Sequence, residues 1–97
     1  KTEKGKWLET DNIAIEIRCR GKKSGLSITE ADWWFHILTD NGKVKGMLCL
    51  PVDELKSICK ALLMNKKAKR IMGGDDKQSE MILLPIKDVA GLIGKLF

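Results

Sequence analysis

Alternation of apolar and polar residues marks the first element that the chain predicts. From residue 13 the sequence reads Ile-Ala-Ile-Glu-Ile-Arg-Cys-Arg, so the isoleucines and Cys19 share one face and Glu16 with two arginines the other. A period of two is typical of a half-buried β-strand. We therefore predict a strand over residues 13–20. The segment 21–25 contains two glycines and two lysines and is predicted to be an exposed turn.

Residues 27–50 predict a short helical turn followed by a β-hairpin. Ser27 and Glu30 have the spacing of a capping box, which favours a helical turn at 28–32. Aromatic residues then favour a strand over 33–39. The sequence Asp-Asn-Gly at 40–42 is a strong hairpin signal, so 43–50 is predicted to be the return strand.

The remaining half of the chain is predicted to form two helices and one strand. After Pro51, apolar residues repeat at helical spacing through Met64, which predicts a helix whose apolar face includes Leu55 and Leu62. The basic run 65–70 is either a solvated loop or a contact for phosphate. A glycine-rich turn at 73–76, a strand at 80–85 and a terminal helix at 86–96 complete the α/β order.

Composition limits the class of protein. The 97 residues are 43% apolar and 32% charged, which suits a single folded domain over 1–97. The longest apolar run, 81–86, is too short to cross a bilayer, so we expect no membrane association. A sheet of this size leaves an edge strand open, which would allow a homodimer to form by strand pairing.

Charge and cysteine content indicate what kind of partner, compartment and metal ligand the chain is suited to. The formal net charge of +5 favours a polyanion such as nucleic acid, although solubility alone can explain it. Three widely spaced cysteines indicate reduced thiols and a cytoplasmic location. A single His and no Cys-x-x-Cys argue against a zinc site, which leaves carboxylates as metal ligands.

Several short motifs resemble those of a known group of enzymes. The runs Asp-Asn-Ile-Ala-Ile-Glu (11–16), Arg-Gly-Lys-Lys-Ser-Gly-Leu (20–26) and Thr-Glu-Ala-Asp-Trp-Trp (29–34) occur in this order. Leu-Pro-Val-Asp-Glu-Leu (50–55), Gly-Gly-Asp (73–75) and Leu-Pro-Ile (84–86) follow. Together they resemble small phage-type nucleases of the PD-(D/E)XK superfamily, and the resemblance covers essentially the whole chain. It implies a restriction-endonuclease-like mixed sheet with flanking helices, here a partial core, and magnesium-dependent hydrolysis of DNA phosphodiesters.

The chain departs from that family at its start. The chemistry needs carboxylates to hold Mg²⁺ and a lysine to activate water. In the family these acids and a Glu-x-Lys signature lie just before the strand that resembles residues 11–16. The opening Lys1-Thr-Glu3 looks like the tail of a Glu-x-Lys-x-Asp motif, with Lys1 as the signature lysine and Glu3 in place of Asp. The resemblance therefore implies a catalytic portion before residue 1, and Mg²⁺ or Mn²⁺ would bind only where those acids are supplied.

Within the chain, the candidate catalytic residues are Lys1 and Glu16. Lys1 is either the signature lysine or a frayed chain end. Glu16 is either a carboxylate of the metal shell or an exposed acid paired with Arg18 or Arg20. Asp11 could join Glu16 as a metal ligand only if the chain bends between them.

Candidate contacts with nucleic acid are basic side chains and a hydroxyl in the first strand, the 21–25 loop and the 65–70 run. For the loop the alternative is a plain polar turn. Of Trp33 and Trp34, one is expected in the core and the other available to stack on a base, because neighbours on a strand face opposite sides. His36 is expected to be structural or exposed. The full set of nucleic-acid candidates is Arg18, Arg20, Lys22, Lys23, Ser24, Lys66, Lys67, Lys69 and Arg70.

These observations lead to two hypotheses that involve nucleic acid, beside a third in which the chain is a structural or interaction domain and its basic charge is incidental. The first is a magnesium-dependent DNA endonuclease or exonuclease domain of the PD-(D/E)XK type that lacks its N-terminal catalytic portion. The alternative is a basic nucleic-acid-binding module without catalysis.

Overall fold

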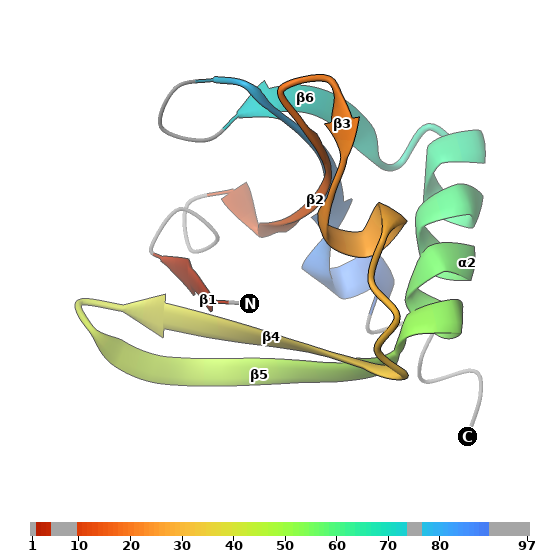
Figure 1. Ribbon diagram of the computed structural model, residues 1–97. Helices are drawn as coiled ribbons and strands as arrows, with labels where there is room; N and C mark the ends of the chain where they lie inside the picture. The colour runs from red at the N-terminus through yellow and green to blue at the C-terminus, as the bar shows by residue number, and fades with distance from the viewer. Residues whose placement is uncertain (1, 5–9, 74–76, 90–97) are drawn as a thin grey trace.

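A computed structural model of the chain describes residues 2–4, 10–73 and 77–89. Its elements confirm the α/β class (Figure 1). After β7, residues 86–89 continue as helix. The elements in chain order are β1 (Thr2–Lys4), β2 (Asn12–Cys19), β3 (Lys22–Lys23), the 3-10 helix η1 (Gly25–Ser27), β4 (Trp33–Asp40), β5 (Lys43–Pro51), α2 (Val52–Met64), β6 (Lys69–Gly73) and β7 (Ser79–Pro85).

The strands form two sheets. Sheet A has the order β1-β4-β5, with β1 parallel to β4 and the β4–β5 hairpin antiparallel. Sheet B has the order β3-β2-β7-β6 and is antiparallel throughout. In Figure 1 the hairpin of sheet A lies below sheet B, and α2 stands at one side. The mixed sheet that the sequence led us to expect is therefore the three-stranded sheet A, and most strands belong to a second sheet.

A shared core joins α2 to the two sheets. Leu55, in the middle of the apolar face of α2, is 0% exposed, as are Ile15 of β2 and Leu84 of β7. The helical spacing predicted from the sequence is confirmed, because the buried positions of α2 are those of one face. The buried apolar residues are Ile13, Ile15, Leu26, Leu38, Leu50, Val52, Leu55, Ile58, Cys59, Leu62, Ala68, Ile82, Leu84 and Val89.

Local interactions define both ends of α2. The Val52 amide donates to the Asp32 carbonyl at 2.8 Å, which ties the start of the helix to the start of β4. Acidic residues in the first turn complement the positive end of the helix dipole. At the other end Lys66 has a φ of +59°, and the amides of Lys67 and Ala68 donate to the Leu62 carbonyl. This left-handed turn closes the helix and brings Ala68 into the core.

Close packing of η1 against β2 requires a glycine. Gly25 has a φ of +51°, and a Cβ at this position would collide with the carbonyl oxygen of Glu16. The Ser24 amide donates to the Ile17 carbonyl at 3.0 Å and holds the loop on the strand. The Ser-Gly dipeptide at 24–25 thus has a structural reason of its own.

Three local predictions differ from the structure. The helical turn predicted at 28–32 is wrong, because the turn forms at Gly25–Ser27, where the glycine permits the left-handed start. The run 65–70 is not entirely a loop, since β6 begins at Lys69 and pairs with β7. Residues 22–23 form a short strand inside the predicted turn. Residues 74–76 of the predicted turn and 90–96 of the terminal helix lie outside the described residues.

Within the described ranges, no helix is both long and apolar enough to cross a membrane.

Candidate nucleic-acid interface

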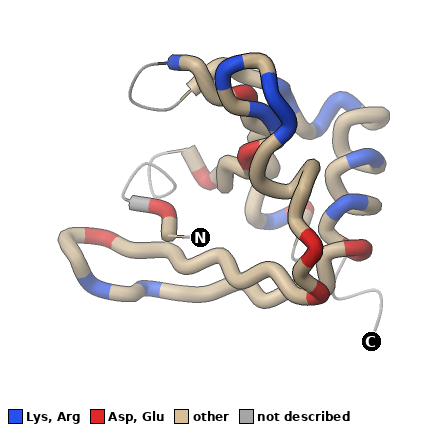
Figure 2. Tube along the Cα trace, in the orientation of Figure 1, with Lys and Arg blue, Asp and Glu red and all other residues tan. Residues whose placement is uncertain are grey.

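Exposed basic residues lie at both edges of sheet B. One edge is β3, with Lys22 and Lys23, and the other is β6, with Lys69 and Arg70. Figure 2 shows Lys and Arg gathered over sheet B and along α2. The two basic segments found in the sequence therefore border one sheet, with β2 and β7 between them.

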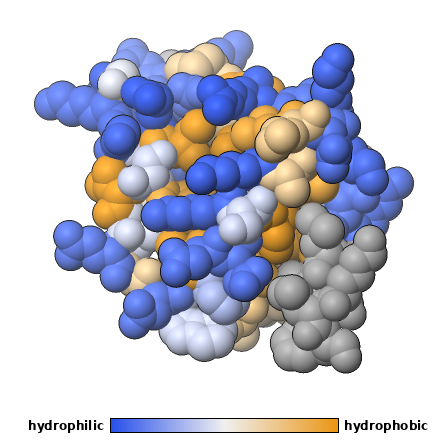
Figure 3. All heavy atoms as spheres, turned by 90° about the vertical axis from the view of Figure 1, so that its right-hand side faces the viewer, coloured by the Kyte–Doolittle hydropathy of each residue, from blue (hydrophilic) through white to orange (hydrophobic). Residues whose placement is uncertain are grey.

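A groove of about 210 Å³ lies between α2 and sheet B. Lys56 and Lys60 of α2 and Arg70 of β6 contribute the basic side chains of its lining. Figure 3 views the molecule from this side and shows apolar surface between hydrophilic side chains that extend across it. The groove thus combines an apolar floor with cations from two elements. Its other lining residues are Ile17, Leu26, Ser27, Cys59, Leu63 and Ile82.

Sequence reasoning missed two of these groove residues. Lys56 and Lys60 are four positions apart and lie on one side of α2, close to Leu63. Lysine stems can cover apolar surface while the ammonium stays in water. Two lysines bordering an apolar helix face were the available signal, but we used the helix pattern only to find the core.

Acidic neighbours accompany two of the predicted contact residues. Arg18 lies 3.7 Å from the Glu80 carboxylate of β7, so its ion pair reaches across to the neighbouring strand. Lys67 lies 3.8 Å from Asp88. Exposed ion pairs of this kind contribute only about 0–1 kcal/mol and exchange readily for a phosphate. Arg18 and Lys67 therefore stay candidates for contacts with nucleic acid.

Ser24 is placed differently from what a phosphate contact needs. Its hydroxyl oxygen is buried and has no hydrogen-bond partner within the described structure. Its amide and carbonyl serve the loop, since the Ser27 amide donates to the Ser24 carbonyl at 3.0 Å. This arrangement favours the polar-turn interpretation of Ser24.

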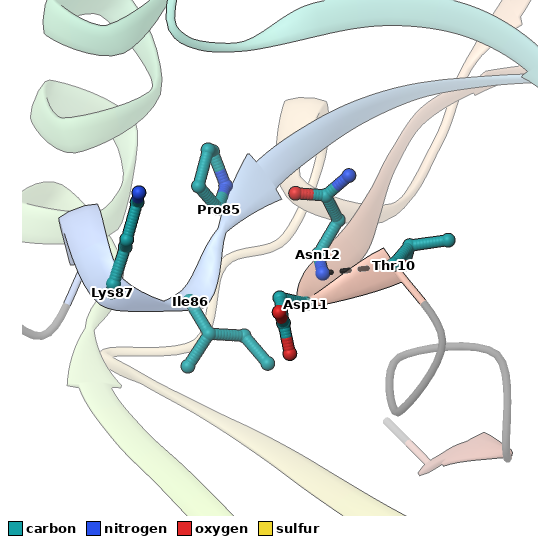
Figure 4. A pocket seen from close by; sticks show the side chains of 6 residues that line it. All are labelled: Thr10, Asp11, Asn12, Pro85, Ile86 and Lys87. Atoms are coloured by element: carbon teal, nitrogen blue, oxygen red, sulfur yellow. Dashed lines mark hydrogen bonds between the residues drawn. The ribbon is translucent and has the colours of Figure 1, made fainter.

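The two candidate metal ligands are not brought together. Asp11 is exposed, has a φ of +56° and lines a depression of about 580 Å³ at the start of β2. In Figure 4 its side chain points away from those of Asn12 and Lys87. β2 runs extended from Asn12 to Glu16, a rise of about 13 Å that separates Glu16 from the bend at Asp11. The described residues contain no group of three His, Cys, Asp or Glu side chains that could hold a metal ion.

The start of the chain nevertheless lies beside β2. Lys1 itself falls outside the described residues. The Oε1 atom of Glu3, two residues later, accepts the amide of Ala14 at 2.9 Å. Ala14 and Glu16 lie on the same face of β2 by alternation. The structure thus brings the segment that resembles the nuclease signature next to the strand that carries Glu16.

The aromatic pair divides as expected. Trp33 is 55% exposed, whereas Trp34 packs against the core and donates its indole N–H to His36. His36 is 1% exposed, so it is a structural histidine rather than a surface one.

The three cysteines are free thiols in different surroundings. Cys49 is exposed and Cys59 is buried in the core. Burial raises the pKa of the Cys59 thiol to about 11, so this group stays neutral near pH 7. A neutral buried thiol is a poor nucleophile, in agreement with its position in the core.

Comparison of the chain with family models, with curated proteins and with solved structures found no match in any of the three. The resemblance to PD-(D/E)XK nucleases therefore rests on the motifs quoted above.

Proposed function

We propose that this chain binds the sugar-phosphate backbone of DNA along the groove between α2 and sheet B. The observation that carries the proposal is that cations from separate elements border the same apolar groove: Lys56 and Lys60 from α2 and Arg70 from β6. Phosphate oxygens attract such side chains, and the release of counterions from DNA makes the contact favourable. The apolar floor would accommodate sugar and base carbons between the phosphates.

The surroundings of the groove support the same proposal. The exposed lysines of β3 and β6 extend the basic surface along both edges of sheet B. A backbone that follows the groove would therefore remain within reach of further cations. Contacts of this kind position a nucleic acid without reading its sequence.

Charge reversal in the groove tests this proposal. We expect the Lys56→Glu/Lys60→Glu variant to bind a fluorescein-labelled DNA duplex at least roughly tenfold more weakly at low salt, because phosphate attraction is replaced by repulsion. Fluorescence anisotropy measures the affinity. The matched control is Lys43→Glu/Lys45→Glu, which changes the net charge equally at two exposed lysines of β5. Equal losses in the two variants would mean that net charge alone matters and would overturn the groove assignment.

The second candidate function is the nuclease activity that the resemblance implies. We propose it because β1, which follows the signature-like Lys1, lies beside the β2 strand that resembles the family's Asn-x-x-x-Glu segment. In this proposal sheet A is part of a restriction-endonuclease-like core. The described carboxylates do not fit Mg²⁺ by themselves, since Asp11 and Glu16 are apart and no group of three acids occurs among the described residues. The metal would depend on acids that precede residue 1.

Cleavage assays test the second candidate. The 97-residue chain is expected to leave single-stranded, duplex and branched DNA intact in Mg²⁺ or Mn²⁺. In a chain extended at its N-terminus, Glu16→Gln should reduce magnesium-dependent cleavage, whereas Glu30→Gln, at an exposed loop position, should not. Cleavage by the chain alone that disappears in Glu16→Gln or Asp11→Asn would show that it holds a complete site and would contradict the dependence on further acids. Cleavage by the extended chain that Glu16→Gln leaves unchanged would contradict the assignment of Glu16 to the metal site.

A further inference from the structure

His36 is buried on the inner face of β4 and is hydrogen-bonded at both ring nitrogens. Its Nε2 atom lies 2.7 Å from Oε1 of Glu3, and its Nδ1 atom lies 3.2 Å from Nε1 of Trp34. The ring is 1% exposed, and the Glu3 side chain is 14% exposed. Two residues from one strand and one from its neighbour thus form a continuous chain of polar groups.

The partners of His36 determine where its proton lies. An indole N–H can only donate, so Nδ1 of His36 must accept with its lone pair. The single proton of the neutral ring then sits on Nε2 and is donated to the Glu3 carboxylate. Hydrogen-bond chemistry therefore assigns one defined tautomer to the neutral ring.

The same carboxylate connects the two sheets. Oε1 of Glu3 also accepts the amide of Ala14 in β2 at 2.9 Å. The Thr39 hydroxyl donates to the Glu3 carbonyl at 3.2 Å and adds to the pairing of β1 with β4. The link from Trp34 through His36 and Glu3 to Ala14 thus runs from sheet A to sheet B.

We propose that this link is an acid-sensitive connection between the two sheets, in which protonation of His36 releases the Trp34 indole. An imidazolium carries N–H donors on both nitrogens. Its new Nδ1–H would face the indole N–H, two donors that cannot bond, so Trp34 must move. The His36–Glu3 contact meanwhile becomes an ion pair and persists. Acid would therefore loosen the Trp34 end of the link and keep the Glu3 end.

Other ionisable groups around His36 do not replace Glu3 in this role. Across the hairpin, Leu48 of β5 lies opposite His36. From α2 the core receives the Cys59 thiol, which stays neutral because burial raises its pKa to about 11. The other ionisable residues described on β2, β4, β5, α2 and the turns next to them are exposed or half-exposed. They are Asp11, Glu16, Arg18, Cys19, Arg20, Asp32, Asp40, Lys43, Lys45, Cys49, Asp53, Glu54, Lys56, Lys60 and Lys66.

Nitrogen NMR of the unmodified protein tests the tautomer directly. At neutral pH we expect Nδ1 of His36 to show the shift of an unprotonated ring nitrogen and Nε2 that of a protonated one. On acidification the His36 signals and the indole N–H signal of Trp34 should change at the same pH. The proposal would be overturned by a ring protonated on Nδ1 at neutral pH, or by an indole N–H signal of Trp34 that stays constant while the His36 signals change.

Two substitutions should move the His36 transition in opposite directions. Trp34→Phe removes the donor that holds Nδ1 unprotonated, so the midpoint of the transition should move to higher pH. Glu3→Gln keeps an acceptor and removes the charge that stabilises the imidazolium, so the midpoint should move to lower pH. Trp33→Phe, at the exposed neighbour, is the control and should leave the midpoint unchanged. A midpoint that neither Trp34→Phe nor Glu3→Gln moves would contradict the proposal, and where a variant fails to fold the NMR of the unmodified protein decides.

Discussion

Sheets A and B share a core but present different outer surfaces. On the outer face of the β4–β5 hairpin, Trp33, Phe35 and Met47 are each at least half exposed. The register explains this, because Phe35 pairs with Cys49 and Ile37 with Met47 on one face while His36 faces inward. Sheet B instead carries exposed lysines and arginines along both edges. Among the described residues, exposed cations thus line two edges of sheet B, whereas sheet A presents an exposed apolar face.

This difference is the reason why the proposed DNA interface is placed beside sheet B and not at sheet A. An exposed tryptophan alone would suggest base stacking at sheet A. Asp32, however, is adjacent to Trp33. Trp33 pairs with Pro51 at the end of β5, and Asp53 follows two residues later. Carboxylates at that end repel phosphate, whereas the groove beside sheet B is bordered by cations. Charge therefore outweighs aromatic exposure in assigning the interface.

The largest expected effect is on the core that both sheets share. Leu55→Ala removes a side chain that is 0% exposed and should lower the free energy of unfolding by about 3–5 kcal/mol. Because both sheets pack on this core, unfolding should stay a single transition when followed by circular dichroism and by tryptophan fluorescence. Met64→Ala, at a position 83% exposed, is the control and should change stability by less than about 0.5 kcal/mol. Two separate transitions would mean that the sheets are independent units.

A smaller effect is expected from the loop that packs on sheet B. Gly25→Ala places a Cβ against the Glu16 carbonyl at positive φ and should cost about 2–3 kcal/mol. Gly21→Ala has a similar φ of +79° but nothing within 4 Å, so only backbone strain of about 1 kcal/mol is expected. Urea denaturation of both variants measures the difference. Equal losses would contradict the close approach of η1 to β2.

Much of the fold could be predicted because it depends on the local periodicity of apolar and polar residues. The alternation in β2, the hairpin signal at 40–42 and the apolar face of α2 each depend on neighbours along the chain, and the structure confirms all three. β6 escaped notice because it is an edge strand whose residues 69–72 are exposed, so it lacks an alternating pattern.

Long-range pairing could not be predicted in the same way. β1 pairs with β4, and β2 pairs with β7 at the other end of the chain. The residue pattern of a strand does not indicate which other strand it pairs with, so the division into two sheets could not be predicted. For the same reason the bond between Glu3 and His36 was missed, although both residues were considered separately. The groove was missed because it forms only when α2 meets sheet B.

The smallest expected effects concern the thiols, which report on the hairpin and on the core. At pH 8, iodoacetamide should modify the exposed Cys49 quickly and the buried Cys59 only through unfolding. The pKa of Cys59 is raised from 9.0 to about 11 in the folded chain, so above pH 9 the unfolded state loses this proton first. Keeping the Cys59 thiol protonated therefore stabilises the folded state fully below pH 9, and this stabilisation is lost as the pH rises towards 11. Mass spectrometry of labelled peptides provides the measurement, and rapid labelling of Cys59 in the folded protein would contradict its burial.

The salt dependence of DNA binding tests the central claim most directly. If cations beside sheet B contact phosphates, the logarithm of the association constant for duplex DNA should fall linearly with the logarithm of salt concentration, with a slope of about −0.9 per contact. We expect a slope of about −3 to −5 for the unmodified chain, becoming less steep by about 2 in Lys56→Ala/Lys60→Ala. Anisotropy titrations at four salt concentrations provide both slopes. Binding that does not depend on salt, or a slope that the double variant leaves unchanged, would contradict the account.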